Sequence, residues 1–219
     1  MRIAVLALCA ATPAFAAPKP PPPASLCPTA IESAERAAHT APGLLAAIGV
    51  VESGRRDPRT GQRLPWPWTV TAEGTGTYYP GKAEAIAAVQ ALQARGVTSM
   101  DVGCMQVNLL HHPTAFRSLE EAFDPPRNTA YAARFLMQLY TRTGTWPAAA
   151  AAYHSFTPEL GAQYAKLIAA VWAGAPVLVV ASAGGAEVVT FPDGGQMRVF
   201  RDASAPNGRQ RVLGYLSSP

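Results

Sequence analysis

Hydrophobic residues recur at helical spacing over most of the middle of this chain. Leu44, Leu45, Ile48 and Val51 share one face of a helix predicted over residues 43–53. The same periodicity, bounded by proline, threonine or glycine, predicts further helices over residues 31–39, 82–95, 125–142, 146–153 and 158–173. The pattern therefore predicts a mostly α structure.

Two regions carry β signals instead. Residues 68–79 are rich in aromatic and β-branched residues around a Gly-Thr-Gly turn, which predicts a small β-hairpin inserted between helices. Short β-prone runs at 177–180, 188–191 and 197–200, separated by glycines, fall in a C-terminal tail over residues 175–219. Residues 55–64 are polar and rich in turn residues, and residues 100–112 are interpreted as a strand or loop that enters a short helix. The fold class is thus α+β with a predominance of helix.

The N-terminal residues have the pattern of a secretory signal. A basic start at Arg2 precedes a short apolar run and a small-residue ending at Ala14–Ala16, which predicts cleavage after Ala16 and export of the chain. The apolar run is too short for a membrane span. The proline-rich residues 17–27 are expected to form an extended spacer before a helical domain over residues 28–174.

Composition narrows the possible functions. Hydrophobic residues make up 49% of the chain, which supports a buried core. The net charge is +4, but the basic residues are scattered, so no nucleic-acid surface is expected. Loss of the leader removes Cys9 and leaves Cys27 and Cys104. In an exported chain these two cysteines could form one disulfide, and the alternative is two unpaired, buried thiols.

Glu52 is the most informative carboxyl group. It follows Ile48 by four positions and therefore borders the apolar stripe of its predicted helix, in the last turn before Gly54. The helix dipole and the apolar neighbours both disfavour its charge, so we expect a raised pKa, as a general acid needs. The alternative is a helix-end glutamate that faces solvent. Candidates for a second catalytic carboxylate are Asp57, Glu73 and Asp101.

Three short motifs occur in a fixed order on this helical chain. They are Glu52-Ser53-Gly54, Gly103-Cys104-Met105-Gln106 and Ala152-Tyr153-His154. Their order resembles the soluble lytic transglycosylase family, which has a lysozyme-like fold, and the resemblance covers residues 29–172. The chain departs from the family pattern at Cys104, where leucine is usual, and at His154-Ser155, where asparagine and a small residue are usual. The hairpin and helix between the first two motifs make that gap unusually long.

The resemblance implies roles for the matching residues. Glu52 corresponds to the single catalytic acid, and Tyr153 corresponds to the tyrosine that hydrogen-bonds the catalytic carboxyl. Gln106 is expected to donate a hydrogen bond to the sugar or its acetamido group. A bond between Cys27 and Cys104 would join the Gln106 loop to the first helix. The residues expected to bind substrate are Ser53, Gly103, Met105 and Gln106.

The implied activity is cleavage of the β-1,4 bond between N-acetylmuramic acid and N-acetylglucosamine in peptidoglycan. One glutamic acid protonates the bridging oxygen, and its carboxylate then takes the proton of the sugar 6-hydroxyl, which closes a 1,6-anhydro ring. The resemblance implies no cofactor and no metal, and it implies peptidoglycan glycan strands in the periplasm as the binding partner. The alternatives are a hydrolytic, lysozyme-type muramidase and a non-catalytic peptidoglycan-binding or scaffold protein.

Three further features have open interpretations. The aromatic residues of the inserted region either stack on sugars or form the core of the hairpin. His111 and His112 lack metal-ligand spacing and are interpreted as loop or surface groups. The tail over residues 175–219 is predicted to serve location or binding to a cell-envelope partner, and the alternative is a hairpin that caps the domain. The aromatic residues in question are Trp66, Trp68, Tyr78 and Tyr79.

Overall fold

The computed structural model describes residues 20–58 and 60–174 in full, and it describes the backbone of four strands between residues 178 and 216. The predicted signal segment 1–16 and its cleavage site lie outside the described residues. In this described part, no helix is both long and apolar enough to cross a membrane. The helices are α1 (Pro23–Ala38), α2 (Leu44–Ser53), α3 (Lys82–Ala94), α4 (Leu119–Ala122), α5 (Pro125–Thr143), α6 (Trp146–His154) and α7 (Pro158–Trp172).

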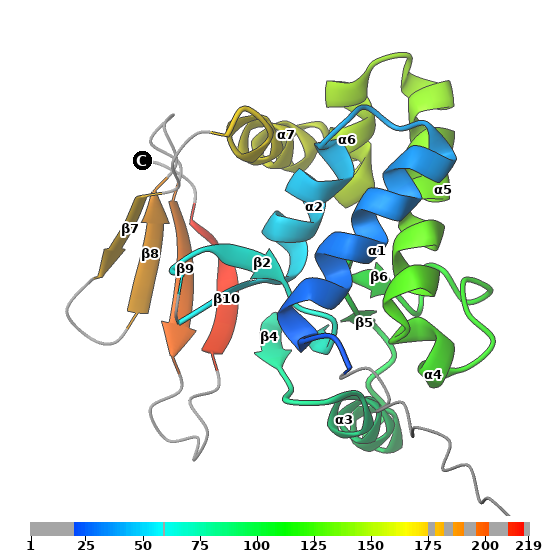
Figure 1. Ribbon diagram of the computed structural model, residues 1–219, viewed down its shortest axis with the longest axis vertical. Coiled ribbons are helices and arrows are strands. Elements are labelled where there is room, and N and C mark those ends of the chain that lie inside the picture. The colour runs from blue at the N-terminus through cyan, green and yellow to red at the C-terminus, as the bar shows by residue number, and fades with distance from the viewer. Residues whose placement is uncertain are drawn as a thin grey trace, which may run out of the picture.

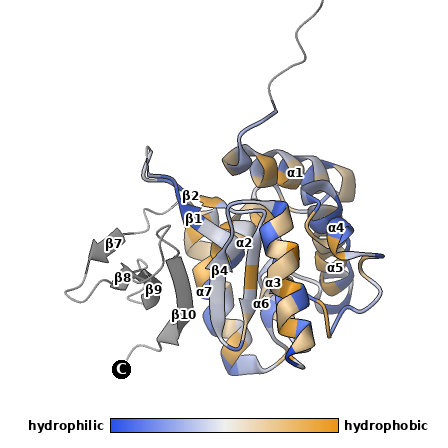
Figure 2. Cartoon of the chain, turned by 90° about the horizontal axis from the view of Figure 1, so that it is seen from below, coloured by the Kyte–Doolittle hydropathy of each residue, from blue (hydrophilic) through white to orange (hydrophobic). Residues whose placement is uncertain are grey.

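The long helices confirm the mostly α fold that hydrophobic periodicity predicts. Gly54 and Gly144 stand at the C-terminal ends of α2 and α5, where the sequence places helix stops. Helix α2 packs between α1 and α7, while α1 also crosses α5 (Figure 1). Helices such as α3 and α5 carry both hydrophobic and hydrophilic residues, as expected when one side of a helix is buried (Figure 2).

The first helix begins earlier than predicted. It starts at Pro23, inside the stretch 17–27 expected to be an extended spacer, and Pro28 lies within it. A proline in the first turn costs little because the first amides of a helix have no partner there. Pro28 does remove one internal hydrogen bond. Cys27 is fully buried and Ile31 is 1% exposed, so the helix is stabilised by packing against the core. The prediction of an extended spacer did not take this packing into account.

Two clusters of buried side chains organise the domain. The larger one joins α1, α2, α5, α6 and α7 and includes the fully buried Leu45 and Ile48. The smaller one lies between α3, α4 and the strands that follow α2, and it includes Val89, Val102 and Phe123. Helix α2 therefore ends between a helical layer and a sheet layer, which is where Glu52 lies.

The sheets contain both predicted and unpredicted strands. The predicted hairpin is present as β3 (Thr69–Ala72) and β4 (Thr75–Tyr78). The stretch interpreted as turns contains a second hairpin, β1 (Gly54–Arg56) and β2 (Arg63–Pro65). Residues 100–112 form β5 (Met100–Val102) and β6 (Val107–Asn108) followed by turns rather than a helix. The sequence does not predict β1 and β2 because each strand has only three residues and the stretch around them is polar.

The C-terminal strands extend the main sheet. Its order is β6-β5-β3-β4-β10-β9-β8-β7, and β10 runs antiparallel to β4. Three of these strands coincide with the β-prone runs in the sequence, while β10 has no counterpart among them. This pairing docks the tail on the domain, and its role in partner binding stays a prediction. The strands are β7 (Leu178–Ala181), β8 (Ala186–Thr190), β9 (Gln196–Arg201) and β10 (Gln210–Leu216).

Cys27 and Cys104 form a disulfide, as predicted from the cysteine count. The bond joins α1 to the turn between β5 and β6, with the two Cα atoms 5.7 Å apart and the two cysteines separated by 77 positions in sequence. Cys27 is 0% and Cys104 1% exposed. A buried cross-link of this span strongly restricts the unfolded chain.

We expect removal of the disulfide to destabilise the domain without changing its topology. The double substitution Cys27→Ala and Cys104→Ala should lower the free energy of unfolding by about 2–5 kcal/mol. Urea denaturation of oxidised wild type, reduced wild type and the double variant measures this effect. The last two samples should unfold together, and an unchanged urea midpoint after reduction of the wild type would contradict the prediction.

Candidate active site

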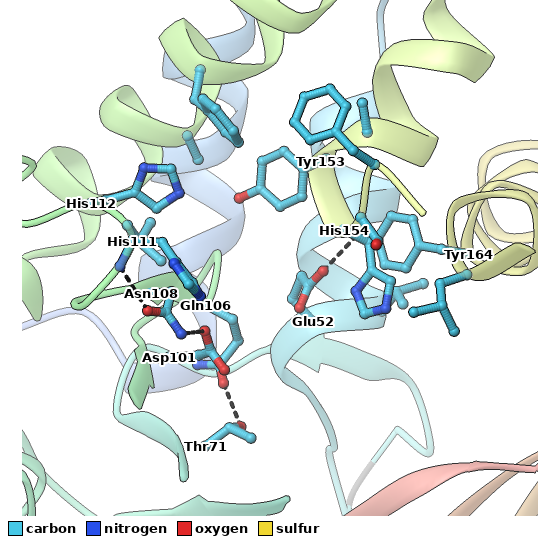
Figure 3. A pocket seen from close by; sticks show the side chains of 18 of the residues that line it. Glu52, Thr71, Asp101, Gln106, Asn108, His111, His112, Tyr153, His154 and Tyr164 are labelled. Atoms are coloured by element: carbon cyan, nitrogen blue, oxygen red, sulfur yellow. Dashed lines mark hydrogen bonds between the residues drawn. The ribbon is translucent and has the colours of Figure 1, made fainter. Parts of the chain in front are cut away.

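A cavity of about 740 Å³ lies where α2, α5, α6 and α7 meet the turn after β6. Glu52 enters it from the last turn of α2, as Figure 3 shows. Tyr153 and Tyr164 line the same cavity from α6 and α7, and Asp101 lines it from β5. The cavity thus gathers ionisable groups from segments far apart in the sequence.

The Glu52 carboxyl is held by one tyrosine. The hydroxyl of Tyr164 donates a hydrogen bond of 2.6 Å to Oε1 of Glu52. Burial raises the pKa of Glu52 to about 8, while the Tyr164 bond lowers it and the nearby Asp101 raises it further. This is the direction predicted from the sequence, with burial as the leading cause. At neutral pH the carboxyl is therefore mainly protonated, and it can donate a proton.

Tyr153 does not make the bond predicted for it. Its hydroxyl donates to the carbonyl oxygen of Met105 over 2.9 Å, and Tyr164 supplies the bond to Glu52 instead. Figure 3 shows Tyr153 with its hydroxyl directed away from Tyr164. Burial and the neighbouring Glu52 raise the pKa of Tyr153 well above its ordinary value, so it stays a neutral donor. Tyr153 thus holds the turn beneath the cavity.

Three of the residues expected to bind substrate are structural. Ser53 is fully buried and donates to the carbonyl oxygen of Cys104 over 2.6 Å. Met105 lies in the larger core at 0% exposure. Gly103 has a φ of 81°, and a Cβ there would collide with the side chain of Asn128. None of the three lines the cavity. The second motif is therefore a tightly packed turn.

Gln106 lines the cavity, but its amide is fully engaged. Its Nε2 donates to the carbonyl oxygens of Thr69 and Gly103, at 3.2 and 3.0 Å. Its Oε1 accepts a 2.6 Å bond from the hydroxyl of Thr71. Both amide hydrogens are thereby used within the protein, contrary to the prediction of a donor to the sugar. Gln106 also has a φ of 47°, which these bonds hold in place.

Asp101 is the acidic candidate that lies in the cavity. Burial raises its pKa, opposed by the hydrogen bond from Asn108 and by the charge of His111. The Asn108 bond joins Nδ2 to Oδ1 of Asp101 over 2.9 Å. The other two candidates lie elsewhere: Asp57 caps the β1–β2 turn, and Glu73 pairs with Arg95.

His111 and His112 lie in the loop after β6, as expected from the sequence, and both also line the cavity. Nδ1 of His112 and the hydroxyl of Tyr131 are 2.8 Å apart in a hydrogen bond. The His112 ring also meets Phe135 edge-on at 4.8 Å. Burial lowers the pKa of His112, which favours the neutral ring. Their closeness to the second motif is the signal that could have revealed them.

The aromatic residues of the inserted region serve the structure. Trp66 donates through Nε1 to the carbonyl oxygen of Tyr79, and the buried Tyr78 donates to Gly54. Trp66 and Trp68 meet edge-on at 5.6 Å. None of these four lines the cavity, and the contacts of Trp66, Trp68 and Tyr78 are those that the hairpin-core interpretation expects. Within residues 20–58 and 60–174, no group of three or more histidine, cysteine or acidic residues is placed to hold a metal ion.

Comparison with protein-family models finds one family that matches most of the described domain. The model described as Transglycosylase SLT domain matches residues 29–164. The matched range contains Glu52, the turn around Gln106, Tyr153 and, at its last position, Tyr164. No curated protein and no solved structure matches the chain.

Two substitutions should shift the pKa of Glu52 in opposite directions. Tyr164→Phe removes a hydrogen bond that stabilises the carboxylate, so it should raise this pKa above about 8. Asp101→Asn removes a negative charge that opposes ionisation of Glu52, so this substitution should lower the pKa of Glu52. Carbon-13 NMR titration of the glutamate carboxyls measures both shifts. Asp57→Asn, in the β1–β2 turn, is the control and should leave the pKa unchanged.

The buried carboxyl should also cost stability at alkaline pH. The pKa of Glu52 rises on folding from 4.5 to about 8, so its stabilising contribution is complete below pH 4.5 and is lost as the pH approaches 8. We expect Glu52→Gln to melt at a higher temperature than the wild type at pH 8, because the amide carries no charge to bury. At pH 4.5 the two should melt together. Equal melting temperatures at both values would show that the site does not disfavour the charge.

Proposed function

Because this chain belongs to the SLT transglycosylase family, whose members are peptidoglycan-cleaving lyases, we propose that Glu52 performs both proton transfers of a lytic transglycosylase reaction. The bond cleaved is the β-1,4 bond between N-acetylmuramic acid and N-acetylglucosamine. The product carries a 1,6-anhydro ring on the muramic acid.

The observation that carries this proposal is the state of the Glu52 carboxyl. Burial raises its pKa to about 8, so at neutral pH it retains a proton to donate. Tyr164 bonds Oε1, and no described residue hydrogen-bonds Oε2. One oxygen is thus fixed by the protein, and the other is left for a substrate in the cavity. A second titrating group is not required.

The reaction has two balanced steps. First, protonated Glu52 gives its proton to the bridging oxygen, the bond from that oxygen to the anomeric carbon breaks, and positive charge develops at that carbon. The hydroxyl of Tyr164 then stabilises the carboxylate left on Glu52. Next, the 6-hydroxyl oxygen bonds to the anomeric carbon while its proton passes to Glu52. The carboxyl returns to its initial state, and no water is consumed.

The 2-acetamido group of the substrate fits this scheme as an internal stabiliser. Substrate-assisted glycoside cleavage uses such a group in place of a second carboxylate. Asp101 is then an electrostatic neighbour whose charge helps to keep Glu52 protonated. The hydrolytic alternative instead needs Asp101 to activate a water molecule, although Asn108 occupies its Oδ1. The two mechanisms leave different glycan ends.

The place of action follows from the substrate and from the N-terminal residues. Peptidoglycan lies in the cell envelope, and residues 1–16 have the pattern of a secretory signal. We therefore assign the activity to the periplasm, with glycan strands as the partner.

Glu52→Gln should abolish glycan cleavage while the protein stays folded. The amide keeps the shape of the side chain but cannot transfer the proton, so the rate should fall by at least ~10²–10⁴-fold. Mass spectrometry of digested, purified peptidoglycan measures both rate and product. Glu32→Gln, on the exposed face of α1, is the matched control and should cleave at the wild-type rate.

The same digest separates the alternatives. Wild-type protein should release fragments with 1,6-anhydro ends. Reducing ends that vanish in Asp101→Asn would establish hydrolysis and overturn the lytic mechanism. Wild-type turnover by Glu52→Gln would remove Glu52 from the reaction.

A further inference from the structure

His154 makes a close ring contact at the edge of the cavity. It is the last residue of α6, and its imidazole lies flat on the ring of Tyr164, with the two centroids 4.7 Å apart and an angle of 6° between the ring planes. Figure 3 shows His154 and Tyr164 side by side next to Glu52. The contact therefore involves the tyrosine that bonds the Glu52 carboxyl.

The two stacked rings differ in exposure. His154 lines the cavity and is only partly covered, so it keeps contact with solvent, whereas Tyr164 is buried, at 5% exposure. The imidazole is thus the more exposed of the two stacked rings, and it covers part of the Tyr164 ring. A tyrosine hydroxyl placed by rotation about two side-chain bonds depends on what packs on its ring. Flat stacking limits the ring to the orientation that reaches Glu52.

The His154 ring acts through this packing and not through a proton relay. No described residue hydrogen-bonds to its nitrogens, and burial lowers its pKa, which favours the neutral form. The other groups that influence Glu52 come from different elements: Asp101 from β5 and Tyr164 from α7. His154 influences the carboxyl through Tyr164.

We propose that His154 is a positioning residue whose imidazole covers the Tyr164 ring and holds its hydroxyl on the Glu52 carboxyl. The inference rests on the proposed function, because it concerns the group that transfers the proton. An aromatic ring of another kind should fulfil the role, while a small side chain should not.

Steady-state kinetics on soluble glycan strands test the contact. His154→Ala should lower kcat by about tenfold and leave KM within about threefold, because the misplaced bond affects the transition state more than binding. His154→Phe should restore kcat to within about threefold of the wild type. The control His39→Asn, at the exposed C-terminal end of α1, should behave as wild type.

A double-mutant cycle tests the route of the effect. In the Tyr164→Phe background no hydroxyl remains to be positioned, so adding His154→Ala should change kcat by less than about twofold. Melting temperatures of all variants confirm that each remains folded at the assay temperature.

Several results would overturn the proposal. These are an unchanged kcat in His154→Ala, a His154→Phe variant as slow as His154→Ala, and effects of His154 and Tyr164 on kcat that multiply independently. The proposed function fails by a different result, namely wild-type turnover in Glu52→Gln or absence of anhydro ends. The two failures are therefore distinguishable in the same assay.

Discussion

Everything at the site depends on how Cys104 joins three segments of the chain. Its sulfur is bonded to Cys27 on α1, and its carbonyl oxygen accepts the hydroxyl of Ser53 at the end of α2. Successive helical residues point about 100° apart, so a buried and anchored Ser53 directs Glu52 toward the cavity. In the first motif, Glu52 therefore faces the cavity, and the following Ser53 fixes the end of α2 to the turn that contains Cys104. A substitution at Cys104 would remove the covalent link to α1 and leave the backbone acceptor for Ser53 in place.

The site keeps a carboxyl group neutral by placing it in a partly apolar cavity, and this opposes stability. Burial is the largest influence on the pKa of Glu52, and the Tyr164 bond only moderates it. Tyr164 lies 112 residues further along the chain, so this bond exists only after α7 has packed on α2. The raised pKa is accordingly a property of the assembled domain and not of the helix end alone.

Local signals predict the helices, the β3–β4 hairpin and the direction of the Glu52 pKa, because periodicity and neighbouring apolar residues determine them. They do not reveal which tyrosine reaches Glu52. Tyr153 lies on α6 and Tyr164 on α7, and the way these two helices pack on α2, which no local pattern specifies, decides between them. The same holds for Gly103 and Met105, which look like substrate contacts in a motif but pack on Asn128 and the core. His111 and His112 reach the cavity because the turn after β6 leads the chain back toward α5.

Two of the side chains that depart from the family pattern, Cys104 and His154, support Glu52 from outside the reaction. Cys104 replaces a leucine, which could pack at this position but could not fix the turn covalently to α1. His154 replaces an asparagine, whose amide has no ring to stack on Tyr164. One departure fixes the backbone beneath the carboxyl, and the other covers the tyrosine that bonds it. An unusual residue beside a motif can therefore be informative, because its contacts show which part of the site needs extra support in this chain.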